Sequence, residues 1–126
     1  GISLAWVAVE ALSVEETLQR LSLSRTGRDC DYPFRGVSSH PLPGGWFLVA
    51  ATPCDHRISR ARTMAALSVG CRAVVCAVEE HVNFASTELW HDGHRVWHVQ
   101  HEGVGDVENI SHAGAVPARF HELLAT

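Results

Sequence analysis

Runs of apolar residues alternate with helically spaced apolar positions in the first half of the chain. The run Ile2–Glu10 is rich in β-branched and aromatic residues and predicts a mostly buried strand. A Ser-x-x-Glu capping box that begins at Ser13, followed by apolar residues at helical spacing, predicts a helix near residues 14–22. A second buried strand is expected at Trp46–Thr52, and a second, shorter helical face follows over residues 58–67.

The second half of the chain contains a strong hairpin signal, Asp92-Gly93, after a third apolar strand at Ala73–Val78. A two-residue turn at this point places His91 opposite His94. The other pairs expected from it are Leu89 with Val96, Glu88 with Trp97, and Thr87 with His98. In this register Trp90 and Trp97 share one face. Both faces mix apolar and polar residues, so the pattern leaves open which side of the hairpin is buried.

The last predicted element is a helix that begins near Pro117 and has Phe120, Leu123 and Leu124 on its apolar side. The predicted order of elements is therefore β-α-β-α-β-β-β-α. This order predicts a single α+β domain over residues 1–126. Its sheet is expected to be mixed and largely antiparallel, with about five strands and with two or three helices packed on one face.

A long irregular segment separates the first helix from the second strand. From Ser24 to Gly45 the periodicity is lost, and glycine and proline interrupt the chain repeatedly. Loops of this length in compact domains are usually functional or disordered. This one carries acidic, aromatic and basic side chains suited to recognition: Asp29, Asp31, Tyr32 and Arg35. We expect a binding surface there.

Charge and composition narrow the classes of function. The formal net charge is −4 and there is no basic cluster, which argues against a nucleic-acid partner. The chain has no lysine, so Schiff-base and phosphate-loop lysines are excluded. The apolar runs are far shorter than the roughly 18 residues that span a bilayer, and the first residues do not resemble a secretory signal. A cytoplasmic protein without a membrane partner is expected, with its four cysteines as free thiols.

Several polar clusters suggest chemistry but lack a complete motif. Four of the nine histidines fall within eleven positions: His91, His94, His98 and His101. Strand alternation allows at most two of them to share a site, so no metal and no cofactor are expected. Cys54 and His56 follow a strand, but residues so close in sequence rarely reach the geometry of a nucleophile and its base. Asp55 is expected instead to cap the next helix.

The hairpin sequence ELWHDGHRVWHVQHE, residues 88–102, resembles the strand, tight turn, strand signature of small bacterial proteins. These include immunity proteins encoded beside polymorphic toxins. The resemblance implies an immunity protein that neutralises a cognate toxin by forming a tight complex, with no need for an active site. An acidic surface with aromatic anchors would suit such a complex. The partner-binding residues expected on this hypothesis are Asp29, Asp31, Tyr32, Arg35, Glu79, Glu80 and Trp97.

Two alternatives from other classes remain at this point. One is a small enzyme or metal-dependent hydrolase that uses Cys54, His56, Glu79 and His81, which requires these groups to converge in a pocket. The other is a homodimeric structural protein that pairs through an edge strand or through the aromatic face of the hairpin.

Overall fold

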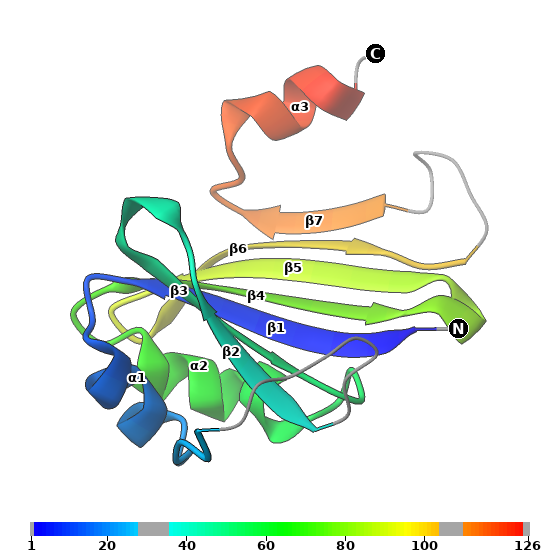
Figure 1. Ribbon diagram of the computed structural model, residues 1–126. Helices are drawn as coiled ribbons and strands as arrows, with labels where there is room; N and C mark the ends of the chain where they lie inside the picture. Colours follow the sequence, from blue (N-terminus) through cyan, green and yellow to red (C-terminus); the bar gives the residue numbers. More distant parts are fainter. Residues whose placement is uncertain (1, 28–35, 104–109, 125–126) are drawn as a thin grey trace.

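The chain folds around one antiparallel sheet of seven strands, in the order β2-β3-β1-β4-β5-β6-β7 (Figure 1). The computed structural model describes residues 2–27, 36–103 and 110–124. The strands are β1 (Ser3–Glu10), β2 (Val37–Pro41), β3 (Trp46–Ala51), β4 (Arg72–Glu79), β5 (Phe84–His91), β6 (His94–His101) and β7 (Ile110–Gly114). The helices are α1 (Val14–Arg20), α2 (Ala61–Leu67) and α3 (Ala118–Leu124), with short 3-10 turns η1 (Pro43–Gly45), η2 (Arg57–Ser59) and η3 (Glu80–Val82).

The core lies between one face of the sheet and the two helices α1 and α2, which both lie below the sheet in Figure 1. Alternate residues of β1 point into it: Ala5, Val7 and Val9 are at most 1% exposed. The side chains that meet them from the helical layer are completely buried: Leu21, Ile58, Met64 and Leu67. Within residues 2–27, 36–103 and 110–124, this helical layer covers one face of the sheet.

The two core helices are fixed at their ends by side-chain hydrogen bonds. The Glu16 N–H donates to Ser13 Oγ (3.0 Å), which is the expected N-cap of α1. The Arg20 guanidinium crosses to the end of α2 and donates to the carbonyls of Leu67 (3.0 Å) and Val69 (2.6 Å). Leu67 is the last residue of α2 and Val69 follows its C-cap, so the arginine supplies hydrogen bonds to carbonyls at and just beyond the helix end.

The α+β class is confirmed, and the expected strands and helices are present with small shifts of their ends. The sheet differs from the prediction in two ways. All pairings are antiparallel rather than mixed, and two further strands, β2 and β7, lie at the two edges, in segments whose sequence shows no periodicity. Only α1 and α2 pack on the core face, since α3 lies beyond β7 on the other side (Figure 1). Within the described ranges no helix has the length and hydrophobicity to cross a membrane.

The predicted register of the β5–β6 hairpin holds as far as Trp90, which pairs with Arg95, and is wrong from Leu89 onward. His91 does pair with His94, and Asp92 and Gly93 both have positive φ, as a tight two-residue turn requires. A β-bulge after Leu89 then shifts the register by one residue, so that Leu89 pairs with Trp97 and Glu88 pairs with His98. The bulge places Trp97 on the face opposite Trp90.

The helix cap predicted at Asp55 is also wrong. His56 caps the η2 turn, its Nδ1 accepting from the Ile58 N–H (3.2 Å). The α2 helix begins later, and its N-cap residue Arg60 makes no side-chain capping bond. The pKa of His56 is lowered, first by burial and then by Arg57 and Arg60, which favours the neutral ring that this capping bond needs.

Candidate protein-binding groove

The face of the sheet opposite α1 and α2 is apolar, and none of the described helices covers its central strands. On β1 this face carries Leu4, Trp6 and Ala8, which alternate with the core residues. The registers place Leu48 of β3 beside Ala8, and Val74 of β4 on its other side. A strand with apolar residues on both faces is typical of sheets covered on both sides. In the part of the chain that the structure describes, only one of the two faces has such a cover.

A groove of about 440 Å³ lies over this face, between the strands β3, β1 and β4 and the turn that joins β2 to β3. We call it the apolar groove. Its lining residues are Leu4, Trp6, Ala8, Leu42, Trp46, Leu48, Ala50 and Val74. Every one of these side chains is apolar. The small residues form the floor, with Ala8 7% and Ala50 8% exposed, while Leu42 on the rim is 38% exposed.

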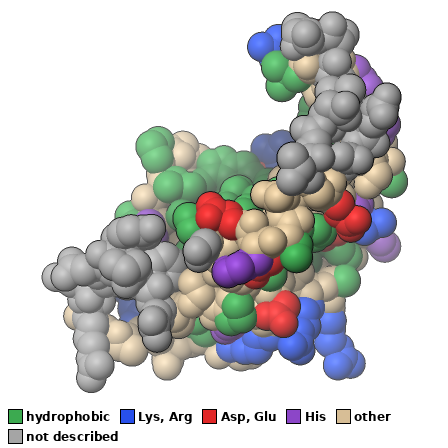
Figure 2. All heavy atoms as spheres, turned by 90° about the vertical axis from the view of Figure 1, so that its right-hand side faces the viewer, with side chains coloured by type: hydrophobic (Ala, Val, Ile, Leu, Met, Phe, Trp, Pro, Cys, Tyr) green, Lys and Arg blue, Asp and Glu red, His purple; other side chains and the backbone are tan. Residues whose placement is uncertain are grey.

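The same apolar face continues past the groove towards the other edge of the sheet. Val74 pairs with Leu89 of β5, and Leu89 pairs with Trp97 of β6, so that all three side chains share the face. Trp97 is half-buried there. Figure 2 shows hydrophobic side chains gathered along the upper side of the body. A contiguous apolar surface of this kind marks an interaction site more often than a solvated face.

The structure separates the partner-binding residues expected from the sequence. The expected contacts at Asp29, Asp31, Tyr32 and Arg35 lie outside the described residues. Glu79 and Glu80 lie at the end of β4, beside a second hollow of about 370 Å³ that is distinct from the apolar groove. Trp97 lies on the apolar face, three strands from β1. Among the expected residues that the structure describes, the two glutamates and Trp97 therefore do not form one patch.

Glu79 is held by contacts within its own molecule. Its Oε1 is 2.8 Å from His81 Nδ1 and also accepts from the His81 N–H (3.2 Å), while its Oε2 lies 3.9 Å from Cys54 Sγ. The hydrogen bond with the Ser3 side chain, followed by those with His81, lowers the pKa of Glu79 to about 2. The carboxylate therefore serves to fasten the start of β1 to the end of β4.

The side chains of Cys54, Glu79 and His81 are not arranged as nucleophilic catalysis requires. A catalytic base must lie beside the nucleophile, with the orienting carboxylate on the far side of the base. Here the carboxylate of Glu79 lies between Cys54 and His81. His56 is engaged by the η2 cap, so it does not complete the set.

The bonds of Glu79 predict an acid-sensitive contribution to stability. Because the folded pKa is about 2, below the ordinary value of 4.5, this contribution is present above pH 4.5 and is lost as the pH falls towards 2. We expect Glu79→Gln to be less stable than the wild type in urea at neutral pH, and the difference to disappear by about pH 2. Glu122→Gln, at an exposed ion pair of α3, is the control. A difference that did not change with pH would contradict the assignment.

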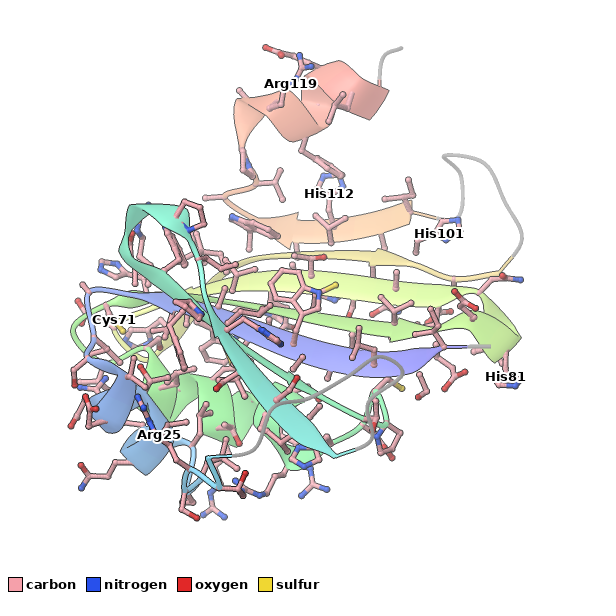
Figure 3. All side chains as sticks on the ribbon, in the orientation of Figure 1. Arg25, Cys71, His81, His101, His112 and Arg119 are labelled. Carbon is pink, nitrogen blue, oxygen red and sulfur yellow. The ribbon has the colours of Figure 1, made fainter. Side chains whose placement is uncertain are left out.

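The histidines are spread over the molecule. His91 and His94 face each other at the hairpin turn, while His98 pairs with Glu88 on the core side and His101 with Ala85 on the other. Figure 3 shows His81 in the turn after β4, His101 at the end of β6, and His112 pointing from β7 towards α3. Among the described residues no group of three or more His, Cys, Asp or Glu side chains could hold a metal ion.

The thiols that the structure describes are free cysteines: Cys54, Cys71 and Cys76. Burial raises the pKa of the Cys71 thiol and also that of Cys76. Cys71 Sγ donates to the Leu67 carbonyl (3.2 Å) at the end of α2. The raised pKa values keep these two thiols protonated at neutral pH.

Sequence reasoning assigned the groove residues to ordinary buried strands, except for Leu42, which it placed in the long irregular segment. The available signal was the doubly apolar pattern of β1 and β3, combined with too few helices to cover two faces of a sheet. A scan against protein-family models and searches of curated proteins and of solved structures found no match for the chain.

Proposed function

We propose that this protein acts by binding another protein, and that the apolar groove is its binding site. The observation that carries the proposal is the uncovered apolar face with Trp6 and Trp46 at its groove. Tryptophan is among the residues most enriched at the energetic centres of protein interfaces. A groove lined only by apolar side chains would gain free energy from burying apolar surface of a partner.

The shape of the site favours a particular partner segment. The groove lies between the β2–β3 turn and the central strands, with Leu42 exposed at its rim. An amphipathic helix laid into such a groove buries its apolar side chains at positions i, i+3, i+4 and i+7 and leaves its polar side in water. The partner is therefore expected to present an apolar helical stripe.

In the form suggested by the hairpin resemblance, the bound protein is a bacterial toxin and this chain is its immunity protein. The net charge of −4 supports this form, because an acidic protein associates faster with a basic partner. No catalytic group is needed, since occlusion of the toxin is sufficient. The geometry does not support the enzyme alternative, because the Glu79 carboxylate lies between Cys54 and His81.

Calorimetric titration with the protein encoded by the neighbouring gene tests this proposal. We expect a one-to-one complex, and we expect Trp46→Glu to weaken it at least about thirtyfold, since a charge in the centre of an apolar site removes a hot-spot contact worth about 2 kcal/mol or more. Val69→Glu is the matched control, because Val69 is 54% exposed at the far end of α2 and lies outside the groove.

Circular dichroism and thermal melting establish that both variants are folded before the titrations are compared. Equal weakening by the two variants, or a complex unaffected by Trp46→Glu, would show that the groove is not the binding site. If the neighbouring protein does not bind at all, the toxin form of the proposal is wrong.

A further inference from the structure

Three exposed arginines at the junction of η2 and α2 form a basic cluster that was not expected from the sequence: Arg57, Arg60 and Arg62. We call them the arginine cluster. In a 3-10 turn, side chains three residues apart lie over one another, so Arg57 and Arg60 project from the same side of η2. Ile58 is completely buried, which directs its two arginine neighbours away from the core. Figure 2 shows arginine side chains gathered along the lower edge of the body, on the side of the helical layer.

The positive charges of this cluster are not neutralised within the part of the chain that the structure describes. None of its three guanidinium groups forms an ion pair with a described carboxylate. Every other arginine that the structure describes does form one with a glutamate: Arg20, Arg25, Arg72, Arg95 and Arg119. The described arginines that lack a carboxylate are therefore the three that lie together.

Hydrogen bonds hold the backbone of the arginine cluster in place. The Arg57 guanidinium donates to the carbonyls of Leu21 (2.6 Å) and Ser22 (3.1 Å), which are neutral acceptors and leave its charge uncompensated. The Thr63 hydroxyl donates to the Arg57 carbonyl (2.7 Å) and joins η2 to the first turn of α2. A surface that is already ordered loses less entropy when it binds a partner.

The pKa of His56, beside the cluster, responds to the same positive charges. Burial lowers this pKa most, and Arg57 and Arg60 lower it further. The opposing effect of Asp55, the acidic residue nearest in sequence, is smaller than that of either arginine. The surroundings of η2 therefore have a positive potential, although the net charge of the chain is −4.

We propose that the arginine cluster binds an acidic segment of a partner protein, as a second interaction surface of this chain. A guanidinium group donates two parallel hydrogen bonds to a carboxylate, so clustered arginines suit a run of aspartate and glutamate. A nucleic acid or an anionic membrane presents negative charge over a wider area, and the remaining surface of this acidic chain repels it. A short acidic segment needs to contact the cluster alone.

The arginine cluster and the apolar groove lie on opposite sides of the sheet. Ile58 of η2 and Met64 of α2 belong to the core on the helical side, whereas the groove lies on the other face (Figure 1). The two surfaces can therefore be occupied at once. The inference goes beyond the function proposed for the groove and does not depend on it.

Fluorescence anisotropy of a labelled peptide of ten glutamates, titrated with the full chain at low ionic strength, tests the inference. We expect binding that is lost between about 0.01 M and 0.15 M salt, because the Debye length falls from about 30 Å to about 8 Å. The double variant Arg60→Gln, Arg62→Gln should weaken binding about tenfold, since each exposed ion pair contributes a factor of up to about five. Arg57 is left unchanged, because its guanidinium also bonds the Leu21 and Ser22 carbonyls.

The matched control is the double variant Arg95→Gln, Arg119→Gln, which removes the same charge from exposed arginines of β6 and α3. It should change binding about twofold or less, and Trp46→Glu, which alters the groove, should leave it unchanged. Circular dichroism establishes that all variants are folded. The inference would be overturned by a peptide that does not bind at low salt, by equal losses in the two double variants, or by tighter binding of an RNA oligomer or of phosphatidylserine vesicles. Loss of peptide binding in Trp46→Glu would show that the two surfaces are not separate.

Discussion

Leu67→Ala is expected to lower the free energy of unfolding by about 2–5 kcal/mol, the range for removing a buried leucine side chain that leaves a cavity. Leu67 is completely buried at the end of α2, among the residues that join both helices to the sheet. Its carbonyl accepts from Arg20 and from the Cys71 thiol, and these bonds fix the backbone around the cavity. Partial collapse of the cavity is therefore limited, and the larger part of the range is expected.

Urea denaturation of the variant measures this loss directly, with Val69→Ala as the matched control two residues away. Val69 is 54% exposed, and a change at such a site is usually within about 0.5 kcal/mol. Comparable losses for Leu67→Ala and Val69→Ala would mean that the helical layer does not pack on the sheet as described.

Gly114→Ala is expected to detach β7 and α3 from the sheet. A Cβ atom at this position would lie 2.3 Å from the Val96 carbonyl oxygen and 3.0 Å from Trp97 Cα, and both are backbone atoms that cannot rotate away. The φ of +83° adds the cost of a left-handed conformation for a residue with a side chain. We expect the amides of β7 to lose their protection from hydrogen exchange, while those of β1 and β4 keep theirs.

Gly103→Ala separates the effect of the steric collision from the effect of the left-handed backbone conformation. Gly103 has a similar φ of +79°, but an added Cβ would meet nothing within 4 Å. This control therefore carries the conformational cost without the collision, and its effect on β7 should be much smaller. Equal effects of the two substitutions would show that the close approach of Gly114 to β6 is not what the structure describes.

The central strands and the core helices could be predicted because the spacing of their apolar residues matches the sides that they bury. The Ser13 cap and the helical spacing after it define α1, and continuous apolar runs define β1, β3 and β4. The edge strands could not be predicted in this way. Most residues of β2 and β7 are exposed, so neither strand shows an apolar alternation, and only pairing with β3 and β6 makes them strands.

The site was harder to predict than the fold. A single bulge after Leu89 reverses the face of Trp97, and nothing in the hairpin sequence marks that position. The groove itself exists because no described helix covers the second face of the sheet. A run such as that of β1 describes a strand with two apolar sides, and the sequence does not say whether a layer covers both of them.

Fluorine NMR of the protein labelled with fluorotryptophan tests the central claim most directly, because the four tryptophans report on different places. Trp6 and Trp46 line the apolar groove, Trp97 lies on the same face, and Trp90 is only 8% exposed on the core side. Single Trp→Phe variants assign the four signals. When the partner protein is added, we predict that the Trp6 and Trp46 signals shift while the Trp90 signal stays in place. A complex that forms without moving the signals of Trp6 and Trp46 would contradict the assignment of the groove as the binding site.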